Sequence, residues 1–433
     1  MTPIQIGILG IVFLFLMLAA SMPVAFTMGI VGFLGFSLIV SPQAAVSMIT
    51  TDLFDTFSSY SLTVIPLFVL MGQVSMHSGI SRKLFNAAYH WLGPLPGGLA
   101  MATVGACAGF GAICGSGPAT AATMASVALP EMKRFHYSNE LSTGTVAAGG
   151  GLGMMIPPSV VFICYAIMTE QSIGKLFISG IIPGIMISLL FCVTIWIICR
   201  YKPELGPKAP PTTFKAKVAS LLGVAETILL FIMVMGGMFA GIFTPTEAAA
   251  VGAAGSILIA LFGRNFSWKM LIQSLHETAR TSCMVLIIIA GAVMFGHFLA
   301  VTRIPSELAA WLSSLVLPGW VIMAIIIFFY LIAGCFVDAL ALVMLTIPIF
   351  YPVVIGLGFD PIWFGVIIVL VTQMGVITPP VGVNVYVVSG IARDVALQTV
   401  FKGSMPFLIA LIVAAAILIL FPELALWLPN LIG

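Results

Sequence analysis

The sequence predicts an all-helical polytopic membrane protein with an inverted internal repeat, two re-entrant helical hairpins and two interrupted transmembrane helices. Three observations support this prediction. Hydrophobic residues make up 61% of the 433 residues and charged residues 7%, and apolar runs of about 18 or more residues are typical of bilayer spans. A helix-breaking motif occurs twice. Lysine and arginine residues gather on loops that one topology places on a single side of the membrane.

The repeated motif is a glycine-rich stretch followed by two prolines inside an apolar run. Its first copy is Gly-Gly-Gly-Leu-Gly-Met-Met-Ile-Pro-Pro-Ser at 149–159, and its second is Gln-Met-Gly-Val-Ile-Thr-Pro-Pro-Val-Gly at 373–382. Pro157 and Pro379 are 222 residues apart (379 − 157). Glycine loosens the backbone, and proline removes an amide donor and clashes with the preceding turn. Two such interruptions at corresponding places in two halves indicate a binding site at the middle of the membrane.

The N-terminal region, residues 1–59, is predicted to form scaffold helices. Apolar spans of roughly 4–20 and 23–40 are followed by a polar link that contains Asp52 and Asp55. The first span has no basic segment before it and no clear small-residue cleavage site. We therefore expect it to be retained and not to act as a signal peptide.

Residues 60–200 are predicted to form the first repeat, and a Pro-rich cytoplasmic linker at 201–218 follows it. The central element is a hairpin of about 97–130, because Gly-Ser-Gly-Pro breaks an apolar segment at 115–118. In chain order, this half has a span at 60–79, an amphipathic surface helix at 80–93, the hairpin, the interrupted helix at 139–168 and a span at 176–199.

Residues 219–280 are predicted to supply further scaffold helices and a surface arm, and residues 281–433 the second repeat. The second hairpin, about 319–352, is broken near Gly334. In chain order, this half has spans at 219–242 and 246–263, surface residues 264–280, a span at 281–300, an amphipathic piece at 303–316, the hairpin, the interrupted helix at 361–390 and a last span at 403–421.

The distribution of basic residues supports the two hairpins. If both are re-entrant, only Lys175 and Arg303 of the 16 lysine and arginine residues lie opposite to the rest. Such a bias marks the cytoplasmic face, and it would be lost if either hairpin crossed the membrane completely. The first hairpin then opens to the cytoplasm and the second to the outside, so the two repeats have inverted topology.

The breaks are predicted to bind Na⁺. Non-helical backbone persists at membrane depth only inside protein or around a cavity, and unwound carbonyl groups there coordinate Na⁺. We expect two or more coupling Na⁺ ions and no other cofactor. The first sodium site is predicted to comprise Gly115, Ser116, Gly117, Gly153, Ile156 and Pro157, and its counterpart Gly334, Cys335, Gly375, Thr378 and Val381. An alternative interpretation is that these glycines and prolines only allow kinks or tight helix packing.

An anionic substrate is predicted to bind between the two ions, where half-helix N-termini attract a carboxylate. Asp338 lies in an apolar run, and intramembrane acids by default face cavities or partners; the alternative is an acid hidden at the hairpin interface. His77 and His297 are interpreted as packing residues at the ends of spans. The predicted substrate-binding residues are Ser116, Thr120, Pro158, Ser159, Asp338, Pro379 and Asn384.

The motifs at 115–122, 149–159 and 373–384 resemble the large membrane subunit of tripartite ATP-independent periplasmic (TRAP) transporters. This resemblance implies a multi-pass protein of the bacterial inner membrane that imports organic acids, such as C4-dicarboxylates or sialic acid, with Na⁺. It implies the elevator-type architecture of the wider ion-transporter superfamily. It also implies two partners: a small four-helix membrane subunit, expected as a separate polypeptide, and a periplasmic substrate-binding protein.

Other interpretations fit the sequence less well. A stand-alone Na⁺/dicarboxylate symporter would share the repeat but need no partner. A channel usually repeats its hairpins around a symmetric pore, and an intramembrane hydrolase needs a nucleophile–base pair that the sequence lacks. We therefore expect no catalytic residues. The seven cysteines lie in or beside apolar segments without a C-x-x-C pair, so we interpret them as buried apolar residues.

Small residues are predicted to provide the surface for the small subunit, because they allow close packing of helices in lipid. The candidates are Gly29, Gly32 and Gly35 in the second span and Gly236, Gly237 and Gly241 in a later one. The loops at 41–58 and 243–247, together with Arg303 and Glu307, are the candidates for contact with the binding protein.

Overall fold

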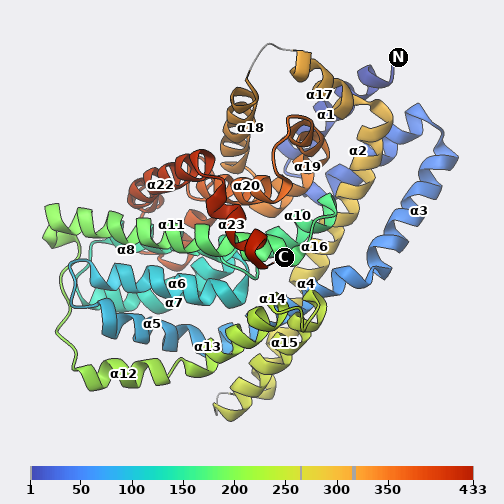
Figure 1. Ribbon diagram of the computed structural model, residues 1–433. Coiled ribbons are helices and arrows are strands. Elements are labelled where there is room, and N and C mark those ends of the chain that lie inside the picture. The colour runs from blue at the N-terminus through green and yellow to red at the C-terminus, as the bar shows by residue number, and fades with distance from the viewer. Residues whose placement is uncertain (1, 264–265, 315–317, 433) are drawn as a thin grey trace.

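The computed structural model describes residues 2–263, 266–314 and 318–432, and the regular elements in those ranges are all helices (Figure 1). Seven of the described helices are long and apolar enough to cross a membrane, or eight if a bent pair at 214–239 counts as one span. This finding agrees with a polytopic helical membrane protein. Five further apolar helices of 10–17 residues include members of the two predicted hairpins.

The chain begins with three helices and not two. α1 (Pro3–Ala19) and α2 (Val24–Ile39) match the expected spans, but the segment expected as a polar link is helix α3 (Pro42–Ser58). The Ser41 side chain accepts a hydrogen bond from the Ala44 amide, and Pro42 occupies the first helical position. Both features start helices well, so the sequence contained the evidence for α3. η1 (Tyr60–Thr63), α4 (Val64–His77) and α5 (Ile80–Leu92) follow.

The first hairpin and the first interrupted helix have bounds close to those expected. The hairpin is α6 (Gly98–Cys114) and α7 (Gly117–Arg134). The interrupted helix consists of α8 (Asn139–Gly150), the short α9 (Leu152–Met155) and α10 (Val160–Thr169). After α11 (Ile173–Tyr201), the linker contains η2 (Pro203–Leu205) and the start of α12 (Phe214–Leu222). The span expected at 219–242 is not one helix but the end of α12, α13 (Ala225–Phe231), the π-helical η3 (Ile232–Gly236) and α14 (Gly237–Phe239), bent by 47° after α12.

The second half shows the same order of elements. α15 (Pro245–Phe262) precedes α16 (Trp268–Thr302), and α17 (Ile304–Ser314) follows. The second hairpin is α18 (Gly319–Gly334) and α19 (Ala339–Gly356), and the second interrupted helix is α20 (Pro361–Gly375) and α21 (Val383–Ile391). α22 (Leu397–Leu420) and α23 (Glu423–Ile432) complete the described chain.

Helix α16 is a single 35-residue helix that joins the expected surface arm to the expected span. Figure 1 shows it running beside α2, and it also packs against α3 and α4. Two histidine–carboxylate contacts hold it: His77 Nε2 lies 3.0 Å from Glu277 Oε2, and His297 Nδ1 lies 2.9 Å from Asp52 Oδ2. Both histidines, interpreted from the sequence as packing residues, therefore make polar contacts between helices.

Gly32 and Gly35 of α2 face α16, which contradicts their predicted role as a surface for another subunit, whereas the role predicted for Gly29, Gly236 and Gly241 stays a prediction. A Cβ atom on Gly32 would lie 2.8 Å from the Met294 carbonyl carbon, and one on Gly35 would lie 2.2 Å from the Phe298 ring. Both glycines are buried within this chain. The space beside Gly237 is also filled within this chain, since a Cβ atom on Gly237 would lie 2.4 Å from the Phe243 ring.

The two halves interlock around the interrupted helices. α7 and α8 of the first half pack against α21, and α8 also packs against α22. α19 of the second half packs against α10, and α20 packs against α9. Lys133 on α7 forms an ion pair with Asp394, and Lys402 on α22 lies 3.1 Å from Glu140 on α8. Each hairpin is thus attached to an interrupted helix of the other half.

Candidate functional site

The tip of the first hairpin rests on the first helix break. Gly115 has a φ of +65° between α6 and α7, and its carbonyl accepts a hydrogen bond of 3.2 Å from the Val160 amide at the start of α10. A Cβ atom on Gly115 would lie 2.6 Å from the Pro158 carbonyl oxygen. Only glycine combines this left-handed conformation with so close an approach, so the sequence determines how the tip and the break meet.

A second close approach lies one turn deeper in the hairpin. A Cβ atom on Gly111 would lie 2.8 Å from the Gly153 Cα, and one on Gly153 would lie 2.8 Å from the Ser116 carbonyl oxygen and 2.4 Å from Thr120 Oγ1. Thr120 is fully buried, and its hydroxyl lies beside the Cys114 thiol and makes no hydrogen bond to a nitrogen or oxygen atom among the residues that the structure describes. Backbone and hydroxyl oxygens of the hairpin therefore converge on Gly153.

The remaining residues of the first predicted ion site lie at the same break. Gly117 contacts the Met154 side chain, and the backbone leaves helical geometry at Ile156, whose side chain packs against Gly184. Pro157 is buried. Gly115, Ser116, Gly117 and Gly153 are thus brought into one cluster, with Ile156 and Pro157 forming the unwound segment beside it.

The second break repeats this arrangement. A Cβ atom on Gly375 would lie 2.4 Å from the Gly334 carbonyl carbon. The Cys335 carbonyl accepts hydrogen bonds from the Val381 and Gly382 amides, at 3.1 and 3.4 Å. Thr378 Oγ1 donates to the Met374 carbonyl at 2.7 Å. All five residues of the second predicted ion site therefore lie at the contact between the second hairpin and its interrupted helix.

The structure aligns the two hairpins differently from the sequence at their tips. The Gly111–Gly153 and Gly334–Gly375 contacts are equivalent, with offsets of 223 (334 − 111) and 222 (375 − 153) residues. Ser116 precedes α7 as Asp338 precedes α19, again 222 residues apart (338 − 116). The tip residue that corresponds to Ser116 is consequently Asp338, and not Gly334 or Cys335.

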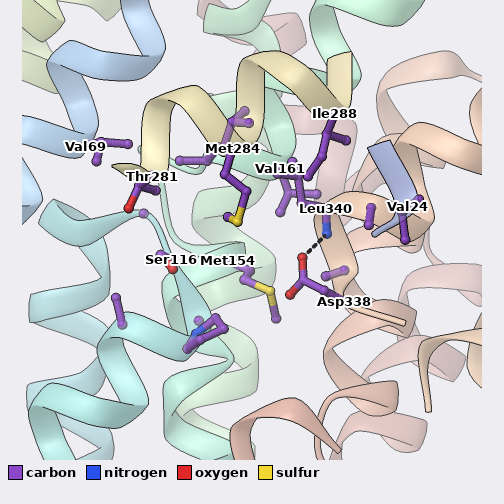
Figure 2. A pocket seen from close by; sticks show the side chains of 18 of the residues that line it. Val24, Val69, Ser116, Met154, Val161, Thr281, Met284, Ile288, Asp338 and Leu340 are labelled. Carbon is purple, nitrogen blue, oxygen red and sulfur yellow. Dashed lines mark hydrogen bonds between the residues drawn. The ribbon is translucent and has the colours of Figure 1, made fainter. Parts of the chain in front are cut away.

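A cavity of about 620 Å³ lies between the two hairpin tips. It is closed by the start of α2, by α4 and by the middle of α16, and its residues include Val24, Val69, Met154, Val161, Met284 and Ile288. In Figure 2, Met154 lies between Ser116 and Asp338. The lining is predominantly apolar, with a few polar side chains placed around it, as is usual for small-molecule sites.

The charged residue among those that line this cavity is Asp338. One carboxylate oxygen, Oδ2, accepts a hydrogen bond of 3.1 Å from the Leu340 amide, shown dashed in Figure 2. The Ser116 side chain does not cap α7 in this way. The N-termini of α7 and α19 thus face the same cavity, one with its cap position open and the other capped by a carboxylate.

The other predicted substrate residues lie elsewhere. Pro158 and Ser159 are buried behind the first tip, where the Ser159 side chain caps α10. Asn384 is buried and donates from Nδ2 to the Ala147 carbonyl at 3.1 Å, and Pro379 is exposed at the second break. Thr120 faces Gly153. Of the seven residues, Ser116 and Asp338 line the cavity.

Two polar residues that line the cavity were not predicted from the sequence. Gln73 on α4 and Thr281 on α16 both line the cavity, and Gln73 Oε1 is buried with no hydrogen-bond partner in the described part of the chain. A glutamine inside an apolar span is costly unless it has a polar partner, so Gln73 was detectable. Thr281 was not, because threonine is common in membrane helices without a binding role.

Comparison with known proteins assigns the family. Residues 11–424 match the family described as Tripartite ATP-independent periplasmic transporter, DctM component. The chain belongs to this family. The C4-dicarboxylate TRAP transporter large permease protein of Pseudomonas aeruginosa is 38% identical, with 92% of each chain covered. The sialic acid TRAP transporter large permease protein of Vibrio cholerae is 30% identical, with 98% of this chain and 97% of the relative covered.

The fold also resembles that of a distant transporter. The Alcanivorax borkumensis YdaH transporter superimposes with a TM-score of 0.64 at 14% identity, covering 89% of each chain. Family membership makes this protein a TRAP large permease, a multi-pass component of the inner membrane and not an enzyme. A TRAP large permease works with a small membrane subunit and a periplasmic binding protein.

Proposed function

We propose that this TRAP permease imports a small organic acid together with Na⁺, binding the acid in the cavity between the hairpin tips and Na⁺ at the two helix breaks. The observation that supports this best is the duplicated contact of a hairpin glycine with a break glycine on either side of one cavity. Oxygen atoms gather at both contacts, and unwound backbone at membrane depth is the usual ligand of coupling Na⁺ in secondary transporters.

Ion binding at the first break involves the Ser116 carbonyl and the Thr120 hydroxyl. Both lie against Gly153, and the Thr120 hydroxyl is buried beside the weakly bonding Cys114 thiol, without a nitrogen or oxygen partner among described residues. A buried hydroxyl without a partner is costly, and a bound cation would remove that cost. At the second break, carbonyl groups near Gly334 and Gly375 and the Thr378 hydroxyl provide the equivalent oxygens.

The substrate is an organic acid of the kind named for the relatives, a C4-dicarboxylate, sialic acid or a similar carboxylate. A carboxylate at the open N-terminus of α7 would accept from its free amide groups. Because Asp338 adds negative charge to the same cavity, bound Na⁺ is needed to balance the charge before an anion enters. This explains why substrate transport would depend on Na⁺.

Movement follows an elevator mechanism in this proposal. The hairpins and interrupted helices, with α11 and α22, form one block, because packing and the Lys133–Asp394 and Lys402–Glu140 ion pairs join the two repeats. Residues 1–59 and 219–280 form the scaffold, with residues 60–200 and 281–433 as the repeats. The α16 helix crosses the boundary at 280 without a break, so the scaffold segment and the second repeat are continuous there.

The inverted, re-entrant arrangement of the hairpins is tested by labelling. A cysteine replacing Lys133 should react with a membrane-impermeant reagent only from the cytoplasm, and one replacing Asp360 only from the periplasm. Labelling of both positions from one side would contradict the inverted topology.

The function itself is tested by uptake into proteoliposomes that contain this chain, its small subunit and its binding protein. We expect uptake of at least one acid from a panel of dicarboxylates, hydroxy acids and sialic acid, driven by an inward Na⁺ gradient. Omission of either partner should abolish uptake. Full uptake by this chain alone would instead favour a stand-alone symporter, which family membership already disfavours.

A further inference from the structure

The side-chain amide of Gln373 is buried inside the molecule. It lies on α20, two residues before Gly375, and its relative exposure is 0%. Neither Oε1 nor Nε2 has a hydrogen-bond partner within the ranges that the structure describes. Such a side chain is unusual, because buried polar groups are nearly always paired. A leucine or methionine side chain would fill the same space without an unpaired polar group. The presence of an amide at this position therefore indicates a function beyond packing.

The contact made by Gln373 lies at the junction of the two repeats. A Cβ atom on Gly151 would lie 2.4 Å from Gln373 Cγ and 2.6 Å from Nε2. Gly151 and Gln373 are 222 residues apart (373 − 151), which is the offset that relates Gly153 to Gly375. They are therefore equivalent positions of the two repeats. Equivalent positions of two repeats contact each other only near the axis that relates the repeats. At this axis the first repeat has a glycine, Gly151, and the second has the amide side chain of Gln373.

This junction lies between the two breaks. Two residues beyond Gly151, Gly153 meets the first hairpin at Gly111, and two residues beyond Gln373, Gly375 meets the second hairpin at Gly334. Asn384, on the far side of the second break, bonds to Ala147 one turn before Gly151, and its Oδ1 is a buried atom lacking a partner in the described chain. Gln373 and Asn384 of the second repeat thus both reach the segment that leads into the first break.

We propose that Gln373 is a positioning residue that couples the two Na⁺ sites, so that an ion at one break raises the affinity of the other. This inference rests on the proposed function. Carbonyl and amide groups of an unwound segment reorient when they take up an ion. The unused donors and acceptor of Gln373 then bond to the reoriented backbone of one segment and hold the other in its ion-binding geometry. Coupling of this kind is reciprocal between the two sites.

The test compares wild-type protein with Gln373→Leu and Gln373→Met, which keep the volume and remove the amide. The tripartite complex is reconstituted, and initial uptake is measured against Na⁺ concentration at saturating substrate. Na⁺-dependent thermal stabilisation of the purified complex gives a second binding curve that does not depend on transport. For the wild type we expect a Hill coefficient approaching the number of coupled sites, about 2. In the variants the coefficient of the thermal-stabilisation curve should fall to about 1, with half-saturating Na⁺ raised roughly 5-fold or more, whereas uptake, which needs both ions, should keep a coefficient above 1.

A matched control removes another buried hydrogen-bonding group away from the junction. Thr346→Val on α19 deletes the hydroxyl that bonds to Tyr330 and to the Leu342 carbonyl. It should lower the unfolding temperature and leave the Hill coefficient unchanged. This control separates a general loss of stability from a loss of coupling.

A second variant series covers the case in which the leucine and methionine variants fail to fold. Gly151→Ala should displace the amide, lower the unfolding temperature and reduce cooperativity, and addition of Gln373→Ala should restore the unfolding temperature without restoring cooperativity. Wild-type cooperativity retained in a folded Gln373 variant would overturn the coupling role and leave the proposed function intact. Uptake by the wild type that does not depend on Na⁺ would instead refute the proposed function.

Discussion

Ser116 and Asp338 are equivalent residues that face one cavity from the two hairpins. Each precedes the second helix of its hairpin, and 222 positions separate them in the chain. Only Asp338 caps its helix, accepting a hydrogen bond from the Leu340 amide. The two-fold repeat therefore produces an asymmetric cavity, with an open helix N-terminus on one side and a carboxylate on the other.

Asp338 can be tested by separating its charge from its capping role. Asparagine caps helices about as well as aspartate, so Asp338→Asn should change the free energy of unfolding by less than roughly 0.5 kcal/mol. Asp338→Ala should cost about 0.5–2 kcal/mol. In both variants uptake should depend less on Na⁺ than in the wild type, because the negative charge that Na⁺ balances before the anion enters is gone. Thermal unfolding and uptake against Na⁺ concentration are the measurements, and an unchanged Na⁺ dependence in Asp338→Asn would show that this charge does not cause it.

Substitution of Thr120 tests the first ion site, and its expected effect on the free energy of unfolding is opposite to that of Asp338→Ala. Thr120→Val removes a buried hydroxyl whose neighbour is the weakly bonding Cys114 thiol and which lacks a nitrogen or oxygen partner in the described chain, so without Na⁺ the variant should be as stable as the wild type or more stable, by up to about 1–3 kcal/mol. The stabilisation that Na⁺ adds should shrink, and half-saturating Na⁺ for uptake should rise. Unfolding temperatures with and without Na⁺ measure both effects. An undiminished Na⁺ response would exclude Thr120 from the site.

The glycine contact at the second break should be intolerant of any side chain. Gly375→Ala would place a methyl group 2.4 Å from the Gly334 carbonyl carbon, so it should displace the second hairpin and abolish uptake. Gly390→Ala on α21 is the matched control, because nothing lies within 4 Å of its Cβ position. A helical Gly-to-Ala change of this kind should stabilise by roughly 0.5–1 kcal/mol. Equal uptake by the two variants would contradict the close contact.

The ion pair between Lys133 and Asp394 predicts a pH dependence. The hydrogen bond from Lys133 holds the pKa of the Asp394 carboxyl below its ordinary value. The pKa of Asp394 in the folded protein is thus lower than in the unfolded chain, where it is about 3.9. The ion pair therefore stabilises the fold fully above a pH of about 3.9, and this stabilisation is lost as the pH falls through the folded pKa. Asp394→Asn should therefore unfold at a lower temperature than the wild type at pH 7, with the difference shrinking in acid and in high salt. A difference that persists unchanged in acid would rule out the ion pair as its cause.

The helix breaks were predictable because their chemistry is local. Gly153, Pro157, Gly375 and Pro379 prevent a continuous helix wherever the chain folds, and the hairpin bounds followed from Gly-Ser-Gly-Pro at 115–118. The residues that start α3 at Pro42 were an equally local signal, but the polar composition of the segment led to the prediction of a link instead of a helix.

Features that depend on packing between distant segments were not predictable. The alignment of Asp338 with Ser116 depends on how each tip settles on its break, which offsets between prolines do not determine. The orientation of Gly32 toward Met294 depends on which neighbour α2 has, because the sequence shows a smooth face but not its partner. Thr281 enters the cavity only because α16 crosses both hairpin tips.

The central claim, that Na⁺ binds at both breaks and moves with the acid, is tested most directly by counting ions. Entry of radioactive Na⁺ and of labelled substrate is measured in the same proteoliposomes containing the complete tripartite system. The account predicts that at least two Na⁺ enter for each substrate molecule, one for each break. Full-rate substrate uptake driven by a proton gradient, with no accompanying Na⁺ entry, would contradict it.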